Sequence, residues 1–189
     1  MTRVTQVTHV TCVTLVTPWT TSVLFATLVA LGGCDPVHDD AIAALGPEAA
    51  GVRRGPLHRP GQPCLLCHDG AIGDPQRFTV AGTVYETPGG LVAVAGISVV
   101  LIDANTSQAE LQVNEAGNFY ATPSQYDPTF PIQVFLRAQG GQAMRMQTLI
   151  EGNGTVEPNG SCASCHLDPA GRNSPGHVCV KLDDGGTPP

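Results

Sequence analysis

The stretch that decides the fold of this 189-residue chain is Phe78-Thr79-Val80-Ala81-Gly82-Thr83-Val84-Tyr85. Every second residue belongs to one face: Phe78, Val80, Gly82 and Val84 alternate with Thr79, Ala81, Thr83 and Tyr85. Successive side chains of a β-strand point to opposite faces, so a period of two is typical of a strand. We therefore predict a strand here and work outward from it.

Four further stretches repeat this period of two, and turn signals rich in glycine, asparagine or aspartate separate them. They cover 97–101, 109–113, 132–136 and 144–150, with a short sixth stretch at 118–120. Short alternating segments with a turn about every ten residues are typical of an antiparallel sandwich. We predict a mainly β chain, with a small antiparallel β-sandwich over 78–150 that is flanked by two short, mostly irregular segments, 57–77 and 151–189.

Each flanking segment carries the pattern C-x-x-C-H. The two copies are Cys64-Leu65-Leu66-Cys67-His68 and Cys162-Ala163-Ser164-Cys165-His166. This is the pattern of covalent c-type haem attachment, because two thiols at this spacing can each add to one vinyl group of a haem. The next residue is then held below the ring, where its imidazole can ligate the iron. The pattern predicts two covalently attached haem c groups, on Cys64, Cys67, Cys162 and Cys165, with His68 and His166 as proximal iron ligands.

Two C-x-x-C pairs also suit a four-cysteine zinc site or a pair of redox disulfides. A zinc ribbon usually separates its pairs by a few tens of residues at most, whereas 94 residues, 68–161, lie between Cys67 and Cys162. A thioredoxin-like site requires a βαβ context, which is missing around both pairs. Neither alternative requires a histidine after the second cysteine, so the sequence favours haem attachment.

On these motifs the chain resembles multihaem c-type cytochromes that carry two haems. The resemblance implies that the distal iron ligand of each haem is a second histidine. His58 and His177 are our candidates. His58 lies six residues before Cys64 and His177 lies eleven residues after His166, so the intervening chain is long enough for each histidine to fold back over a haem. His9 belongs to the leader, and His38 is expected to be an exposed surface residue of the tether described below.

Methionine is the competing distal ligand. Met144 and Met146 lie two positions apart in a predicted strand, where packing in the core is the expected role. Cys179 has no predicted partner among the other cysteines, and we expect it to be a small buried apolar residue between Val178 and Val180.

Three short runs of the predicted sandwich, 81–84, 99–103 and 115–120, resemble the carboxypeptidase regulatory-like (transthyretin-like) domain. The resemblance covers about 70 residues and implies a β-sandwich. The chain departs from that family near 123–131, where a longer loop with prolines replaces a compact turn. Six strands of alternating direction return the chain to the end where it entered, so we expect both C-x-x-C-H motifs at the same end, close enough for electron exchange.

The amino-terminal part of the chain has the composition of an export signal. Residues 22–31 form an apolar run that is too short to span a bilayer but is typical of a secretory signal. The run ends in Leu31-Gly32-Gly33-Cys34, which resembles a bacterial lipobox. The resemblance implies a signal peptide over 1–33 and lipidation of Cys34; a plain signal peptide and an uncleaved anchor are the alternatives.

Residues 34–56 are rich in Asp, Ala, Gly and Pro, and we predict a tether. Within it, Asp39-Asp40 can cap a short helix that runs through Leu45 and that Gly46-Pro47 would end. The protein is then expected to be an exported bacterial lipoprotein, anchored in a membrane on the periplasmic or cell-surface side.

The charge balance bears on the partners. The chain has a formal net charge of −7, and its basic residues are few and scattered. Nucleic acid is therefore an unfavoured partner. An acidic surface suits encounter with a basic patch on a redox partner protein. The sequence shows no nucleophile–base arrangement and no glycine-rich phosphate loop, so we do not predict an enzyme.

Three functions are compatible with these observations. The first is an electron carrier with two six-coordinate haems that exchanges electrons with redox partner proteins. The second is a haem enzyme or sensor in which one iron keeps an open position for peroxide, a small gas or a nitrogen oxide. The third is a cell-surface β-sandwich binding module without haem. The sequence favours the electron carrier, because two additional histidines match two irons.

Overall fold

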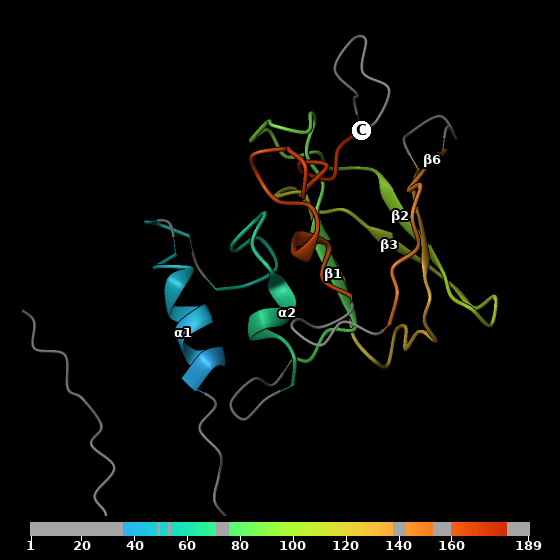
Figure 1. Cartoon of the computed structure of the whole chain (residues 1–189), viewed down its shortest axis with the longest axis horizontal. Helices are drawn as coiled ribbons and strands as arrows, with labels where there is room; N and C mark the ends of the chain where they lie inside the picture. Colours follow the sequence, from blue (N-terminus) through green and yellow to red (C-terminus); the bar gives the residue numbers. More distant parts are fainter. Residues whose placement is uncertain are drawn as a thin grey trace, which may run out of the picture. The chain divides into compact units, whose positions relative to one another are not determined.

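The computed structural model describes residues 36–48, 50–52, 54–70, 76–137, 143–152 and 160–180. The predicted signal peptide over 1–33 and Cys34 lie outside these residues. The chain is mainly β, as predicted, and its two antiparallel sheets form a small sandwich (Figure 1). Among the described residues, no helix has both the length and the apolar character that a membrane span needs.

All six predicted strands are present. One sheet pairs β1 (Val80–Thr83) with β4 (Asn118–Ala121). The other has the order β3-β2-β5-β6, built from β2 (Ser98–Ile102), β3 (Gln108–Gln112), β5 (Gln133–Arg137) and β6 (Ala143–Arg145). The turn from β2 to β3 is fixed by Asp103, whose carboxylate accepts the backbone N–H groups of Asn105 and Ser107.

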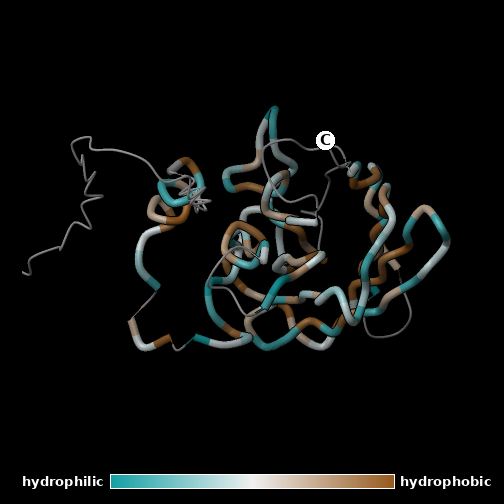
Figure 2. The backbone as a smooth tube through the Cα atoms, turned by 90° about the horizontal axis from the view of Figure 1, so that it is seen from below, coloured by the Kyte–Doolittle hydropathy of each residue, from teal (hydrophilic) through white to brown (hydrophobic). Residues whose placement is uncertain are grey.

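The core lies between the two sheets, where alternate residues of facing strands meet. Its fully enclosed side chains include Val80, Val99, Leu101, Phe119 and Ile132. Figure 2 shows the hydrophobic stretches of the chain, in brown, along the strands, whereas several connecting loops are teal. The period of two in the sequence therefore corresponds to one face of each strand turned toward the opposite sheet.

Within the described residues, three short helices lie outside the sheets: α1 (Pro36–Ala44), α2 (Cys64–Cys67) and the 3₁₀ helix η1 (Cys162–Ser164). A helix is present within the predicted tether as α1, and the chain leaves it through Gly46 at φ +70°. The predicted cap is wrong, because the helix begins at Pro36 and Asp39 and Asp40 lie inside it. Helix α1 contacts α2. This part of the predicted tether is therefore packed beside the first C-x-x-C-H motif.

Strand β1 is buried at every position, although its sequence alternates. Its inner face meets the core, and its outer face is covered by α2, whose Leu65 packs with Phe78 and Ala81. One edge of β1 pairs with β4, and isolated parallel bridges join its chain to Ser161 and Cys179 on the other side. In Figure 1, α2 and η1 both lie beside β1. The segments that carry the two motifs thus share one strand as their support.

Candidate functional site

The first motif forms one turn of helix on the outer face of β1. The N–H of His68 donates to the carbonyl of Cys64 at 2.9 Å, which closes the turn at the histidine. Leu65, one of the two residues between the cysteines, is 2 % exposed and fixes the turn against the sheet. The apolar spacer residue therefore anchors the motif, while the thiols are left half-buried.

The two histidines of the first segment lie close together. Their ring centroids are 5.8 Å apart with an interplanar angle of 60° between His58 and His68. Two imidazoles bound to one metal ion through nitrogens at ~2.0–2.1 Å have ring centres roughly 6 Å apart, so this spacing suits two ligands of one iron. The ring of His68 also stacks on Phe78, at 4.3 Å between centroids.

Each of these rings has its Nδ1 atom engaged. Nδ1–H of His68 donates to the carbonyl of Gln76 at 2.9 Å, and Nδ1–H of His58 donates to the carbonyl of Gly55. A carbonyl oxygen can only accept, so Nδ1 carries a hydrogen, and in the neutral imidazole the lone pair is then on Nε2. This is the arrangement that a metal-binding histidine normally has.

A buried polar cluster holds the backbone near His58. The side-chain amide of Asn118, on β4, donates to the carbonyls of Pro56 and His58 at 3.2 and 3.0 Å. Its oxygen accepts the hydroxyl of Thr83 at 2.7 Å, and that hydroxyl in turn accepts the N–H of Gly61 at 2.7 Å. Strands β4 and β1 thus set the position of the first segment through side chains.

The second segment is attached to the edge of β1 through its backbone. The N–H of Ala81 donates to the carbonyl of Gly160 at 3.0 Å. Gly82 makes room for the motif, because a Cβ atom at this position would lie 2.8 Å from the sulfur of Cys162. The N–H of His166 donates to the carbonyl of Cys162 at 2.9 Å, so this copy of the motif also forms a closed turn.

The histidines of the second segment repeat the Nδ1 pattern of the first. Nδ1–H of His166 donates to the carbonyl of Gly176 at 2.9 Å, and Nδ1–H of His177 donates to the carbonyl of Gly90 at 3.0 Å. The ring of His177 stacks on Tyr85 at 4.3 Å between centroids. All four predicted iron ligands therefore carry their lone pair on Nε2.

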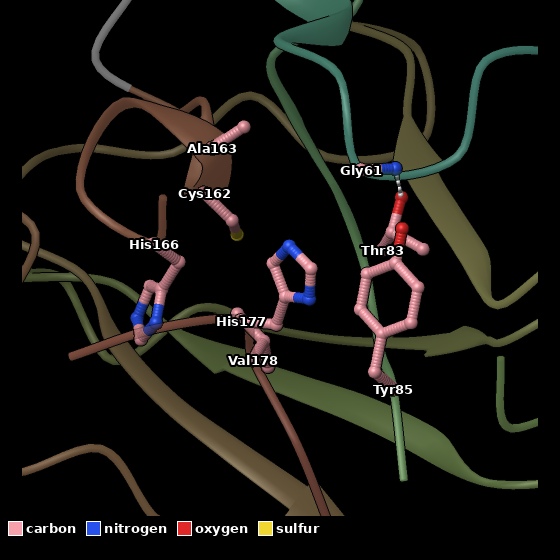
Figure 3. A pocket seen from close by; sticks show the side chains of 8 residues that line it. All are labelled: Gly61, Thr83, Tyr85, Cys162, Ala163, His166, His177 and Val178. Carbon is pink, nitrogen blue, oxygen red and sulfur yellow. Dashed lines mark hydrogen bonds between the residues drawn. The ribbon is translucent and has the colours of Figure 1, made fainter. Parts of the chain in front are cut away.

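One cavity brings the second pair together. His166 and His177 both line it, together with Cys162 from the motif and Thr83 and Tyr85 from the chain of β1 (Figure 3). Its volume is about 10 Å³, roughly the room of one water molecule and far below the ~300–1,000 Å³ of typical ligand pockets. A porphyrin therefore needs more room here than the cavity offers.

A larger cleft adjoins the first motif. Its volume is about 230 Å³, and Leu65, Arg77 and Phe78 are among the residues that line it, whereas the motif thiols and His68 are not. This volume lies below the ~300–1,000 Å³ of typical ligand pockets. The two motifs thus differ in the space beside them.

Burial controls the thiol chemistry of the motifs. It raises the pKa of the Cys162 thiol from 9.0 to about 12, with smaller upward contributions from the Cys64 and Cys165 thiolates. Burial also raises the pKa of Cys64, to about 11. Cys165 is exposed. The two motifs lie near each other because α2 and η1 both contact β1.

The geometry also bears on the zinc and disulfide alternatives. Cys64, Cys162 and Cys165 are free thiols, so neither C-x-x-C pair is closed as a disulfide in this structure. Over the described ranges of the chain, no three His, Cys, Asp or Glu side chains gather in a way that would hold a metal ion. The four motif cysteines therefore do not converge on a shared tetrahedral centre here.

The pKa of His166 is lowered from its ordinary value. Burial is the largest cause, the nearby His177 lowers it further, and the hydrogen bond to Gly176 opposes both. A lowered pKa keeps this imidazole neutral near pH 7, which is the state that binds iron.

Several sequence predictions can be compared with this geometry. Met144 and Met146 pack against the core, which confirms the predicted role. Two predictions are wrong. Cys179 is half-buried, because its neighbours Val178 and Val180 take the positions that face the core. His38 is also half-buried, with Nε2 3.9 Å from the carboxylate of Asp69, because α1 packs beside the first motif.

The expectation that both motifs lie at one end of the sandwich needs a correction in detail. Both motifs lie beside β1 and not beyond its end. The reason is that the second segment runs along β1 in the same direction as that strand. The residues that the sequence did not single out are Thr83, Tyr85 and Asn118. The alternating pattern predicts that these residues belong to strands. It does not predict which other segment of the chain packs against their side chains.

No family model matches the chain, and no curated protein or solved structure matches it either. The likeness to dihaem cytochromes and to the carboxypeptidase regulatory-like domain therefore stays a prediction from the residues quoted above.

The donor atoms of both sites nevertheless fit a c-type haem. Each site offers two thiols and one imidazole on a closed turn. Each also has a second imidazole, whose hydrogen is on Nδ1, so that Nε2 is the atom that can bind a metal. Cys64, Cys67 and His68 would hold one haem with His58, and Cys162, Cys165 and His166 would hold the other with His177. The space beside each motif is smaller than a typical ligand pocket, so both sites have to widen to accept a haem.

Proposed function

We propose that this protein is a membrane-anchored dihaem c-type cytochrome that carries electrons between periplasmic or cell-surface redox partners. The observation that carries the proposal is the pairing of histidines. Each C-x-x-C-H histidine has a second histidine beside it, and all four rings donate Nδ1–H to a backbone carbonyl. Two nitrogen ligands for each iron leave no open coordination position, which suits an electron carrier and not a haem enzyme or sensor.

A bound haem supplies a one-electron couple at its iron, and the chain supplies the rest. The thiols of each motif would hold a haem covalently, and the two imidazoles beside them would bind its iron. The hydrogen bonds at Nδ1 hold each ring in one orientation and raise its basicity toward the metal. The stack of His68 on Phe78 and that of His177 on Tyr85 limit rotation further.

The surroundings suit electron exchange between the two sites and with partners. Both motif-bearing segments contact β1, so their separation is fixed by a single short strand. The net charge of −7 would steer encounter with a basic patch on a redox partner protein. In this proposal, Cys34 carries the lipid that holds the protein at the membrane.

Mass spectrometry of the exported protein, combined with its visible spectrum, tests the proposal. We expect a mass increase of two haems and a lipid, and a reduced spectrum with a sharp α-band that CO does not change. Replacing Cys64 and Cys67 by Ser should remove one haem, and replacing Cys162 and Cys165 should remove the other.

The axial ligands are tested by single substitutions. His58→Ala and His177→Ala should each turn one haem high-spin, while His38→Ala serves as the matched control and should leave both low-spin. A haem that binds CO in the unaltered protein would favour the enzyme or sensor. A colourless protein without added haem mass would overturn the proposal and favour a binding module.

A further inference from the structure

Tyr85 lies between the two motif-bearing segments, just after β1. Its side chain is 5 % exposed. Its backbone joins the second segment, because its N–H donates to the carbonyl of Val178 at 2.8 Å and its carbonyl accepts the N–H of Val180 at 3.1 Å. These two hydrogen bonds fix the place of the ring relative to the chain that carries His177.

The flat face of the ring contacts His177. The two centroids are 4.3 Å apart and the planes differ by 24°, so the rings stack. Nδ1–H of His177 is held at the same time by the carbonyl of Gly90, and its backbone N–H donates to the carbonyl of Pro88 at 2.8 Å. With one face and Nδ1 both occupied, the direction of Nε2 depends on Tyr85.

The other end of the side chain lies against the first segment. Gly61, three residues before Cys64, adopts φ +78°, and a Cβ atom there would lie 2.4 Å from the hydroxyl oxygen of Tyr85. The next nearest atom, Cζ of the same ring, would be 3.4 Å away. Figure 3 shows Gly61, Tyr85 and His177 around the same cavity. The hydroxyl is therefore the part of Tyr85 that contacts the first segment.

We propose that Tyr85 is a positioning residue that orients His177 as the distal ligand of the second haem and couples this ligand to the position of the first segment. The inference rests on the proposed dihaem function. The aromatic ring orients the imidazole, and the hydroxyl transmits displacement of Gly61. The two haem sites are then mechanically linked through one side chain, although each has its own ligands.

The stack is tested in the haem-loaded protein by Tyr85→Leu and Tyr85→Phe. Tyr85→Leu should convert the second haem to a high-spin, CO-binding form, so that half of the low-spin signal is lost, and added imidazole should restore it. Tyr85→Phe keeps the ring and should leave both haems low-spin. Tyr126→Leu is the matched control, because Tyr126 is also 5 % exposed but lies in the core; it should lower stability without a spin change.

The identity of the affected haem follows from double substitutions. Tyr85→Leu should add nothing to His177→Ala, because both release the same ligand. Combined with His58→Ala, it should leave no low-spin haem. A low-spin signal that persists in full in Tyr85→Leu would overturn the orienting role, while the haem count would still stand.

The coupling is tested from the first segment. Gly61→Ala should displace the hydroxyl of Tyr85 and make the second haem partly high-spin, although the change lies beside the first motif. Tyr85→Phe in the same chain removes the clashing oxygen and should restore the low-spin signal, while the backbone strain at φ +78° is the same in both variants.

Two outcomes would contradict this coupling. One is a Gly61→Ala spectrum in which only the first haem changes, and the other is an effect on the second haem that Tyr85→Phe does not reverse. A protein that carries no haem in any variant would instead refute the proposed function, so the two failures are distinguishable.

Discussion

The two motif-bearing segments reach the same strand by different means. The first, around 54–70, is held on the outer face of β1 by a buried leucine and by side-chain hydrogen bonds from Thr83 and Asn118. The second, around 160–180, is held at the edge by backbone hydrogen bonds and by a glycine that leaves room for Cys162. The first attachment depends on which side chains are present, and the second on which are absent.

This difference predicts different sensitivities. Truncating a side chain should release the first segment, whereas adding one should release the second. The thiols differ in the same way, because Cys162 is packed into the sandwich and Cys165 is exposed.

The largest expected effect concerns the thiols before haem is attached. The thiolate is the form that an alkylating reagent attacks. With its pKa raised from 9.0 to about 12, Cys162 has roughly a thousandfold less thiolate near pH 8 than an unperturbed thiol. We expect iodoacetamide to label Cys165 first and Cys162 last in the haem-free chain, as measured by peptide mass spectrometry. Equal labelling rates would contradict the packing of Cys162.

The same shift gives a pH dependence of stability with a defined sign. A thiol whose pKa is raised by folding stabilises the folded state fully below the unfolded pKa, near 9, and the contribution is lost as pH rises toward 12. The haem-free chain should therefore lose stability in alkali. Thioether formation removes the titrating group, so the haem-loaded protein should not show this loss from Cys162.

The second effect is on the first segment. Leu65→Ala should lower the free energy of unfolding by about 3 kcal/mol, because it leaves a cavity beneath α2 while keeping the C-x-x-C-H pattern intact. Leu66→Ala, at the neighbouring half-buried position, is the control and should cost less. Urea unfolding measures both, and equal costs would mean that Leu65 is not the anchor.

The third effect is on the second segment. Gly160→Ala would place a Cβ atom 1.9 Å from the carbonyl oxygen of Thr79, which belongs to the backbone and cannot rotate away. We expect a loss of about 2–3 kcal/mol and increased protease cleavage between 152 and 180. Gly89→Ala is the control, because a Cβ atom there meets nothing within 4 Å. Cleavage confined to the first segment would contradict the claim that Gly160 is needed to attach the second segment.

The smallest effect comes from the polar cluster. Asn118→Ala would leave the carbonyl of His58 without its donor and the hydroxyl of Thr83 without its acceptor, and should cost about 2 kcal/mol. The carbonyl of Pro56 keeps the side-chain amide of Asn114 as a donor. In the haem-loaded protein, the first haem should lose low-spin character while the second keeps it. Asn105→Ala, in an exposed turn, is the control, and a spectral change at the second haem would show that the cluster does not act locally.

The sequence predicted the parts of this molecule that rest on local patterns. The six strands follow from the period of two, whereas the closed turns of the two motifs lie in segments that were predicted to be mostly irregular. What it did not predict is which faces are covered. Strand β1 is buried on both faces because α2 lies across it, and that contact joins residues whose sequence positions carry no common signal.

The candidate site shows the same limit. His58 and His177 could be singled out by counting histidines, but their partners could not. Tyr85 and Asn118 lie in predicted strands, and the alternating pattern assigns each only to one face of its strand. It does not predict that the ring of Tyr85 stacks on His177 or that the amide of Asn118 binds the carbonyl of His58. Their roles arise from the segment that packs on them, which is a property of the tertiary structure.

The attachment of the second segment to β1 has a consequence for solubility. A strand with an unpaired edge is a template on which another copy of a chain can add a strand. Here the carbonyl of Gly160 and the backbone at 178–180 occupy hydrogen-bonding groups along the side of the β1 chain that β4 leaves open. The second motif-bearing segment thus also protects against edge-to-edge aggregation, and a chain that stops before it would expose that edge to other copies of the chain.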